Sequence, residues 1–117
     1  MVWQKITTSL SIILLCFISN STLAVIRYVK PVPSGLGNGS SWANASSDLQ
    51  LMINNSGAND EIWVAAGTYY PTRRADAFTG PVTPGNRLNA FVLKPLVNIY
   101  GGFAGTETLL SERNILT

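Results

Sequence analysis

The chain contains the stretch Glu61-Ile62-Trp63-Val64-Ala65-Ala66-Gly67-Thr68-Tyr69, which predicts a buried β-strand. Because side chains alternate along a strand, Ile62, Val64 and Ala66 are expected on one face and Trp63 on the other. A strand that is apolar on both faces is typical of a parallel sheet covered on both sides. We therefore expect the remaining segments to cover this strand and extend its sheet.

A short helix is predicted just before this strand. Ser47-Asp48-Leu49-Gln50 matches a capping box, in which the Ser47 hydroxyl and the Gln50 side chain bond to each other's backbone amides. An apolar stripe with helical spacing follows at Leu49, Met52 and Ile53. So short a helix is unstable alone, and we expect its stripe to dock on the strand.

Other short strands are predicted at 27–30, 90–93 and 97–100. The glycine-rich segment 34–41 lacks the Gly-Lys-Ser/Thr ending of a phosphate-binding loop, so we interpret it as a connection. The polar connection 70–89 is unusually long for a compact two-layer domain. The strand-then-glycine pattern recurs about 37 residues later, after Ile99. This spacing favours a repeating solenoid.

The N-terminus has the pattern of a secretory signal peptide. Residues 1–5 carry one positive charge, 6–18 are almost continuously apolar, and 19–24 are mostly small and end at Ala24. The apolar run is shorter than the roughly 20 residues that span a bilayer, and an N-terminal anchor or a buried helix is the alternative. We predict a signal peptide at 1–24 and a mature domain at 25–117 that is secreted or held at a bacterial cell surface or outer membrane. No transmembrane segment is expected after cleavage.

Composition narrows the possible functions. Cleavage after Ala24 removes the only cysteine, Cys16, together with Lys5, and leaves seven basic and six acidic residues. No basic stripe is present, so nucleic acid is not an expected partner. Histidine is absent, which removes the commonest general base and metal ligand. We predict no catalytic residue, no cofactor and no metal site in this chain.

Five motifs stand out: Tyr28-Val29-Lys30-Pro31, Gly37-Asn38-Gly39-Ser40-Ser41-Trp42-Ala43-Asn44-Ala45, Asp48-Leu49-Gln50, Glu61 through Thr72, and Ile99-Tyr100-Gly101-Gly102-Phe103-Ala104-Gly105-Thr106-Glu107-Thr108. Together they resemble the start of secreted bacterial right-handed parallel β-helix proteins of the pectin-lyase-like superfamily. The resemblance implies an all-β fold, the start of a parallel β-helix solenoid with a short N-terminal capping α-helix. Since a solenoid needs about three or more repeats, we expect this chain to be a truncated N-terminal piece.

The same resemblance leaves the activity open, because that superfamily contains polysaccharide lyases and hydrolases as well as adhesin-like proteins. For the enzymes of that superfamily, the resemblance implies acidic clusters that bind calcium and a basic residue that abstracts a proton. Both are expected on central coils, which lie beyond this chain. Our first hypothesis is a structural or adhesive N-terminal portion of an exported cell-surface protein, whose partners are a polysaccharide or a host or cell-surface glycan and the remaining downstream coils. The alternative is the N-terminal end of a carbohydrate-active enzyme, a polysaccharide lyase or glycoside hydrolase. A self-contained small sugar-binding domain is a third hypothesis.

Charged residues form two candidate sites, each with a plainer alternative. Arginines that could hold an acidic sugar, or simply be solvated loop charges, are Arg73, Arg74 and Arg87. Carboxylates that could contribute to a calcium site are Asp60, Glu61 and Asp76. This set does not supply the six to eight oxygens that calcium takes. We expect both groups to be structural or solvated.

Aromatic residues form a third candidate, a sugar-stacking platform made of Trp42, Trp63, Tyr69, Tyr70 and Tyr100. Aromatic packing of the N-terminal cap on the first coil is the alternative, since each ring buries a large area. The glycines at 101, 102 and 105 are expected to serve backbone bends where a side chain would clash. We also expect an isolated mature domain to be marginally stable or to associate through its open last coil, because exposed strand edges pair with other chains.

Overall fold

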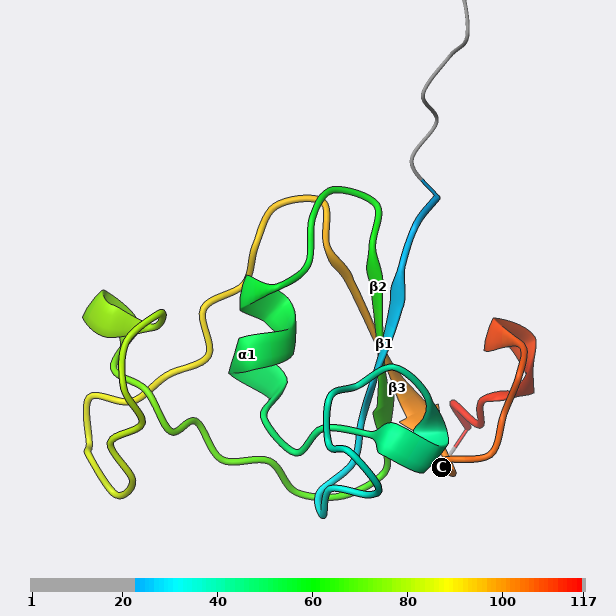
Figure 1. Ribbon diagram of the computed structural model, residues 1–117, viewed down its shortest axis with the longest axis horizontal. Helices are drawn as coiled ribbons and strands as arrows, with labels where there is room; N and C mark the ends of the chain where they lie inside the picture. Colours follow the sequence, from blue (N-terminus) through cyan, green and yellow to red (C-terminus); the bar gives the residue numbers. More distant parts are fainter. Residues whose placement is uncertain (1–22, 117) are drawn as a thin grey trace, which may run out of the picture.

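The computed structural model describes residues 23–116, so the predicted signal peptide lies outside the described residues except for Leu23 and Ala24. Its centre is a parallel sheet with the strand order β1-β2-β3 (Figure 1). The strands are β1 Ile26–Val29, β2 Glu61–Ala65 and β3 Asn98–Phe103. The α-helix α1 spans Leu49–Asn54, and 3₁₀ turns lie at Trp42–Asn44, Ala75–Ala77 and Leu110–Glu112. Among these residues, no helix is long and apolar enough to cross a membrane.

The strand predicted around Trp63 is confirmed as the central strand β2. It pairs in parallel with β1, where Val29 lies beside Val64, and with β3, where Ile99 lies beside Ile62. Both faces of β2 are buried, as its sequence predicts. Ala66 lies beyond the end of the strand and is exposed.

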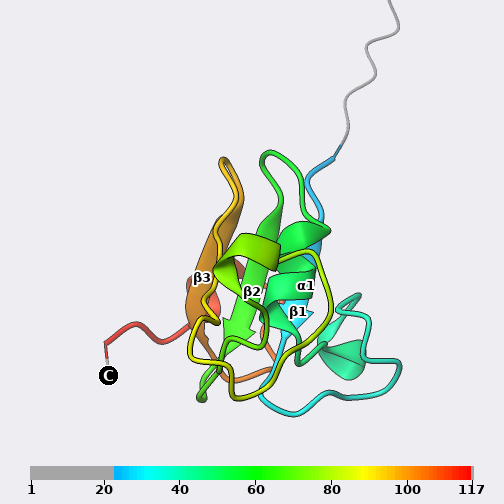
Figure 2. The ribbon, with the colours of Figure 1, turned by 90° about the vertical axis from the view of Figure 1, so that its left-hand side faces the viewer.

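Helix α1 covers one face of the sheet (Figures 1 and 2). The buried core on this side joins Met52 and Ile53 of the helix to Val29, Ile62 and Val64 of the strands. The predicted docking of the apolar stripe is therefore confirmed, with Leu49 only partly buried at its margin.

The predicted capping box is wrong. Asp48 is the N-cap residue of α1, and its Oδ1 accepts a hydrogen bond from the amide of Leu51 at 3.0 Å. Ser47 is exposed. Gln50 does not turn back to the helix start, because its side-chain amide binds the backbone of Val92 instead.

The opposite face of the sheet is aromatic. Phe103 stacks on Trp63 with ring centroids 4.6 Å apart and planes inclined by 10°. Tyr28 meets Trp63 edge-on at 5.7 Å and Trp42 at 4.9 Å. Trp42, from the first 3₁₀ turn, completes the cluster by packing against Phe103 at 5.6 Å.

A β-bulge in β3 makes this stacking possible. Trp63 lies opposite Tyr100, whereas Ala65 lies opposite Phe103, so β3 uses one more residue than β2 over the same interval. Gly102 adopts φ +89°, and a Cβ there would lie 2.6 Å from the Asn114 carbonyl oxygen. Because the bulge accommodates the extra residue, Phe103 lies on the face that carries Trp63.

The outer edge of β1 is covered by the glycine-rich connection. The Tyr28 amide donates to the Gly39 carbonyl at 2.9 Å, and the Ser46 amide donates to the Tyr28 carbonyl at 3.0 Å. Gly39 has φ +78°, and a Cβ there would approach Met52 Sδ to 2.6 Å. Within residues 23–116, no strand pairs with the outer edge of β3.

The predicted fold class, an all-β right-handed parallel β-helix, is wrong. The described chain forms one three-stranded parallel sheet with a helix on one face, and residues 23–116 contain no second sheet of the kind that closes the coils of a β-helix. The strand predicted at 90–93 does not form either, because Val92 is bonded to the Gln50 side chain rather than to a neighbouring strand. The strand predicted at 97–100 is confirmed as the start of β3.

Candidate functional site

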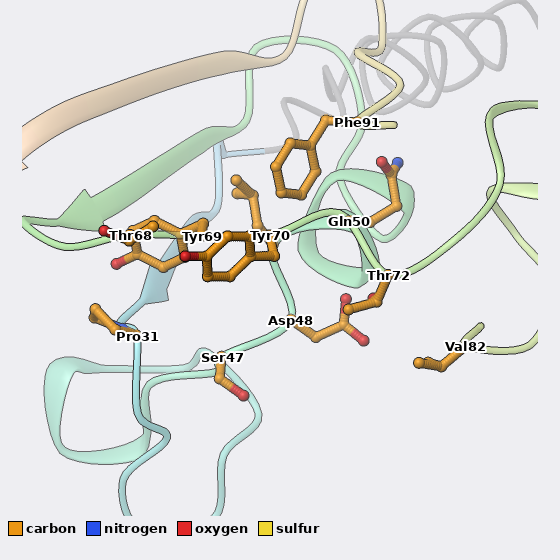
Figure 3. A pocket seen from close by; sticks show the side chains of 11 residues that line it. Pro31, Ser47, Asp48, Gln50, Thr68, Tyr69, Tyr70, Thr72, Val82 and Phe91 are labelled. Atoms are coloured by element: carbon orange, nitrogen blue, oxygen red, sulfur yellow. The ribbon is translucent and has the colours of Figure 1, made fainter. Parts of the chain in front are cut away.

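A surface hollow of about 330 Å³ lies where the chain leaves β2 and passes the start of α1 (Figure 3). Its lining comes from the segment after β1, the helix start, the segment after β2 and the loop before β3. The lining residues are Pro31, Ser47, Asp48, Leu49, Gln50, Thr68, Tyr69, Tyr70, Thr72, Val82 and Phe91. We call this feature the Tyr70 hollow.

Aromatic rings provide much of its apolar surface. Tyr70 is 78% exposed, although it follows directly on the half-buried Tyr69. The Tyr69 hydroxyl donates to the Ala65 carbonyl oxygen at 2.7 Å, which anchors that ring against the sheet, and burial raises its pKa. Phe91 is half-buried and, in Figure 3, lies across the hollow from Asp48. Tyr69 is anchored by its hydroxyl and Tyr70 is exposed, so the two rings present an apolar surface to which a ligand has access.

The polar part of the lining includes a carboxylate that is already paired. Asp48 Oδ1 lies 2.7 Å from Arg73 Nη1, and Asp48 Oδ2 lies 3.0 Å from Arg73 Nη2, a bidentate geometry. Burial acts to raise the pKa of Asp48, but the hydrogen bonds from Arg73 and the Leu51 amide, with the charge of Arg73, hold it below its ordinary value. Asp48 therefore stays ionised, and its charge is balanced by Arg73. The polar lining also includes Gln50, Thr72 and the exposed residues Ser47 and Thr68.

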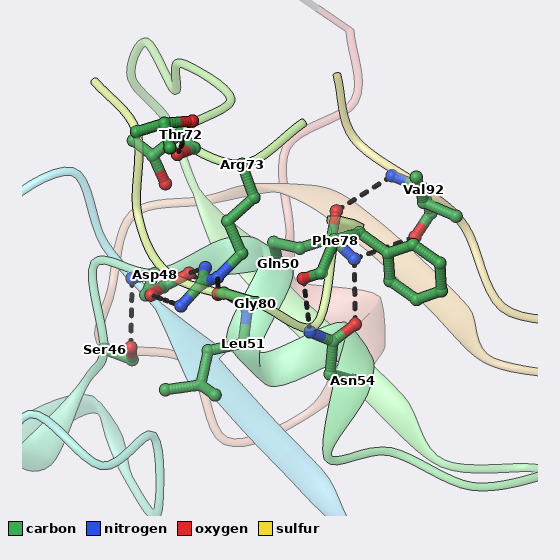
Figure 4. A network of polar contacts seen from close by, with 11 residues as sticks. Ser46, Asp48, Gln50, Leu51, Asn54, Thr72, Arg73, Phe78, Gly80 and Val92 are labelled. Atoms are coloured by element: carbon green, nitrogen blue, oxygen red, sulfur yellow. Dashed lines mark hydrogen bonds and ion pairs between the residues drawn. The ribbon is translucent and has the colours of Figure 1, made fainter. Parts of the chain in front are cut away.

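Side chains of α1 hold the long loop in place (Figure 4). Gln50, 2% exposed, accepts from the Val92 amide at 2.8 Å and donates to the Val92 carbonyl at 3.0 Å. The Asn54 side-chain amide donates to the Phe78 carbonyl at 3.0 Å. Because these bonds satisfy buried polar groups, the loop is fixed against the helix and the hollow is preformed.

The loop is also closed on itself. The amides of Ala75 and Ala90 donate to the carbonyls of Leu88 and Arg73, at 3.2 Å and 3.1 Å. Arg74 and Asn89 form an isolated antiparallel bridge between the two arms. The connection predicted as a long polar loop is thus a folded lobe that lines one side of the Tyr70 hollow.

The three candidate arginines are not brought together. Arg73 is 8% exposed and bonds to Asp48 and to the Gly80 carbonyl, so the alternative of a solvated loop charge is wrong for it. Arg74 forms an exposed pair with Asp76 at 2.7 Å. Arg87 is exposed and lies outside the lining of the hollow. The arrangement offers no arginine cluster for an acidic sugar.

The candidate calcium residues are likewise separated, and each has a protein partner. Asp60 binds Arg27 and two backbone amides, Glu61 accepts from Trp63 Nε1 at 2.8 Å, and Asp76 binds Arg74. Between residues 23 and 116, no group of three or more His, Cys, Asp or Glu residues is placed to hold a metal ion.

All six acidic residues of the chain accept hydrogen bonds from the protein: Asp48, Asp60, Glu61, Asp76, Glu107 and Glu112. Glu107 accepts from the amides of Ala104, Gly105 and Thr106. Burial acts to raise its pKa, but these amides outweigh that effect and hold the pKa below the ordinary value. The carboxylates therefore act as structural acceptors in this fold.

The predicted aromatic platform is divided between three places. The half-buried Trp42 and the buried Trp63 belong to the aromatic cluster on the sheet, in line with the packing alternative. Tyr100 lies under the guanidinium of Arg113, whose central carbon is 5.0 Å from the ring centroid. Of the five residues of the predicted platform, only Tyr69 and Tyr70 line the hollow.

Neither the place of Phe91 in the hollow nor the loop contacts of Gln50 could be predicted from the sequence. Phe91 lies in a segment predicted as a strand, and its role depends on where the loop returns to the helix. No local sequence pattern reports that contact, which joins residues 42 positions apart.

Comparison of the chain with protein-family models, curated proteins and solved structures found no significant match.

Proposed function

We propose that this protein is an exported carbohydrate-binding protein that holds a neutral saccharide in the Tyr70 hollow and acts at a cell surface by adhesion. The single observation that carries the proposal is the exposed ring of Tyr70 beside the preformed hollow. An aromatic ring offers an apolar face for the C–H surface of a sugar. Export is supported by the signal-peptide pattern at 1–24.

The dimensions and chemistry of the hollow support a small ligand. A volume of about 330 Å³ is at the lower end of ligand pockets, which suits one or two sugar units. Apolar rings next to a few oriented polar groups are typical of such sites. The hydroxyls of Ser47 and Thr68 can both donate to and accept from the hydroxyl groups of a sugar.

The charges around the hollow favour a neutral saccharide over an acidic one. No lysine or arginine is among the lining residues, and the one carboxylate there, Asp48, is paired with Arg73. A uronic acid would therefore meet the Asp48 carboxylate without a free cation beside it. Burying an unpaired charge costs free energy, so acidic sugars are disfavoured.

The proposal is tested by titrating the secreted protein with neutral hexose and N-acetylhexosamine oligosaccharides and with oligogalacturonate, using calorimetry. We expect binding of at least one neutral oligosaccharide and none of oligogalacturonate. Tyr70→Ala should weaken the binding about 5- to 10-fold, since a stacked ring contributes about 1 kcal/mol. Tyr70 is largely exposed, so its substitution should leave the melting temperature unchanged.

Tyr100→Ala is the matched control, because this ring packs against Arg113 and lies outside the hollow. It should bind neutral sugars as tightly as the parent. Binding of oligogalacturonate alone, no binding of any saccharide, or equal losses in the two variants would each contradict the proposal.

A further inference from the structure

The backbone just before β1 lies against a carboxylate. The backbone nitrogen of Val25 is 3.0 Å from Asp60 Oδ1, and the Val25 carbonyl accepts from the Glu61 amide at 2.9 Å. The second carboxylate oxygen, Asp60 Oδ2, binds Arg27 Nη1 at 3.0 Å and the Gly57 amide at 2.8 Å. Among residues 23–116, Val25 is thus the first whose backbone hydrogen-bonds to the rest of the domain.

We propose that hydrolysis of the Ala24–Val25 peptide bond produces the mature N-terminus, and that the new α-ammonium group of Val25 forms an ion pair with Asp60. The inference rests on the export part of the proposed function and is independent of the Tyr70 hollow. In the cleavage, water supplies a hydroxyl to the Ala24 carbonyl carbon and a proton to the departing Val25 amine. The amine then takes a second proton from solvent, as an α-amino group does near neutral pH.

The peptide bond is accessible to a peptidase. Leu23 is 87% exposed, and Ala24 and Val25 are exposed as well. Ala24 has the small side chain that signal peptidases take before the cut. Cleavage one bond later would separate Val25 from the sheet and break its backbone contacts with Asp60 and Glu61. The Ala24–Val25 bond thus directly precedes the first described residue whose backbone is hydrogen-bonded to the start of β2 and to Asp60.

The nitrogen is already where an ion pair needs it. Before cleavage it is an amide that donates one hydrogen to Asp60. After cleavage the same atom carries three hydrogens and a positive charge, and a charge-assisted hydrogen bond is stronger than a neutral one. No movement of the chain is required, so the cost in conformational entropy is small.

The charged groups that face the new terminus are Asp60 and Arg27. Their separate contacts keep the two cations on different oxygens of the carboxylate, with Arg27 on Oδ2 and Val25 on Oδ1. A chain that begins one residue earlier would keep the Val25 nitrogen as a neutral amide and carry the new charge on the exposed Ala24 instead. The pairing is therefore specific for a terminus at Val25.

The first test is the intact mass of the protein recovered after the full 117-residue chain is expressed in a secreting bacterium. We expect a chain that begins at Val25. A protein that keeps residues 1–24, or begins at another residue, would overturn the inference.

The second test is the pKa of the Val25 α-ammonium in that secreted protein, measured by NMR titration. We expect it above the ordinary range of about 7.7–8.0, because Asp60 stabilises the charged form. A group with a raised pKa in the folded state stabilises below its unfolded pKa, and this contribution is lost as pH rises through the folded value. The melting temperature should therefore fall by about 2–6 °C as the pH rises from 7 to 10.

Asp60→Asn should return the α-ammonium pKa to the ordinary range and remove most of that fall. Asp76→Asn is the matched control, since Asp76 pairs with Arg74 in the exposed lobe, and it should leave the Val25 titration unchanged. An ordinary pKa in the unsubstituted protein would refute the ion pair, whether or not Asp60→Asn folds. Failure of saccharide binding would refute the proposed function and leave this result intact.

Discussion

The two faces of the sheet are buried in different ways. The face under α1 is aliphatic, with Val29, Ile62 and Val64 beneath Met52 and Ile53. The other face is aromatic and is covered by a 3₁₀ turn and loops instead of an α-helix. Slender aliphatic side chains let a helix approach the sheet closely, whereas broad rings can exclude water by stacking on one another.

The aromatic face also connects distant parts of the chain. Trp42 Nε1 donates to the Glu107 carbonyl at 2.9 Å, across 65 residues, and Trp63 Nε1 donates to the Glu61 carboxylate at 2.8 Å. Each indole therefore buries an apolar body while its polar atom is satisfied. The difference between the faces shows that, where no helix covers a sheet, long-range contacts between a few aromatic rings can bury its face.

Phe103→Ala should have the largest effect, because it removes a fully buried ring from the aromatic face. We expect a loss of about 3–5 kcal/mol in the free energy of unfolding, measured by urea denaturation. Leu116→Ala is the control, since Leu116 is 92% exposed and its truncation should cost little. Equal midpoints for the two variants would show that the aromatic cluster does not hold this face.

On the helix face, Ile53→Ala should cost about 2–4 kcal/mol, because Ile53 is 1% exposed. Leu49→Ala should cost less, about 1–2 kcal/mol, because Leu49 is only partly buried at the margin of the core. Sequence reasoning alone places Leu49 among the fully buried residues and expects about 2–4 kcal/mol for it. Thermal or urea unfolding of both variants measures the difference, and a larger loss for Leu49 would reverse this ranking.

Gly102→Ala should destabilise the aromatic face indirectly, by about 1–2 kcal/mol, through the bulge that places Phe103. Its positive φ is unfavourable for alanine, and the added methyl group would meet the Asn114 carbonyl. Gly101→Ala is a matched neighbour: a Cβ there meets nothing within 4 Å, so little change is expected. Identical melting of the two variants would contradict the assigned geometry of the bulge.

The smallest effects concern acid stability, to which each face contributes one carboxylate. The pKa values of Asp48, behind the helix face, and of Glu107, beside the aromatic face, lie below their ordinary values. A lowered folded-state pKa stabilises the protein above the unfolded pKa of about 4, and this contribution is lost as pH falls through the folded value. We expect stability to decrease below about pH 4, and Asp48→Asn and Glu107→Gln should each make the decrease shallower. A decrease of unchanged slope in both variants would contradict this assignment.

Sequence reasoning predicts the parts of the fold that depend on local periodicity. The alternation of Ile62, Trp63 and Val64 identifies β2 and its two faces, and the spacing of Met52 and Ile53 identifies the buried side of α1. These patterns are informative because burial selects side chains at regular intervals along the chain.

The remaining features depend on pairs of residues that are distant in sequence. Asp48 and Arg73 are 25 residues apart in the sequence, and Gln50 and Val92 are 42 apart. No local sequence pattern can therefore predict either contact. On the sequence alone, the similarity between the stretches at Ile62 and Ile99 favours a solenoid repeat, an interpretation that the single three-stranded sheet contradicts. In the structure these residues are direct neighbours in one parallel sheet, which imposes similar side chains on adjacent strands.

The bulge in β3 has a consequence for how the chain tolerates changes of length. Trp63 and Ala65 are separated by one residue in β2, while their partners Tyr100 and Phe103 are separated by two glycines. Deleting one glycine would leave a regular ladder with Phe103 still opposite Ala65, because side-chain parity is preserved. Deleting Val64 would instead move the side chains that follow it in β2 to the opposite face of the sheet. The edge strand β3 can therefore lose one residue without changing which face its side chains occupy, whereas the central strand β2 cannot. We expect natural length variation at this edge of the sheet.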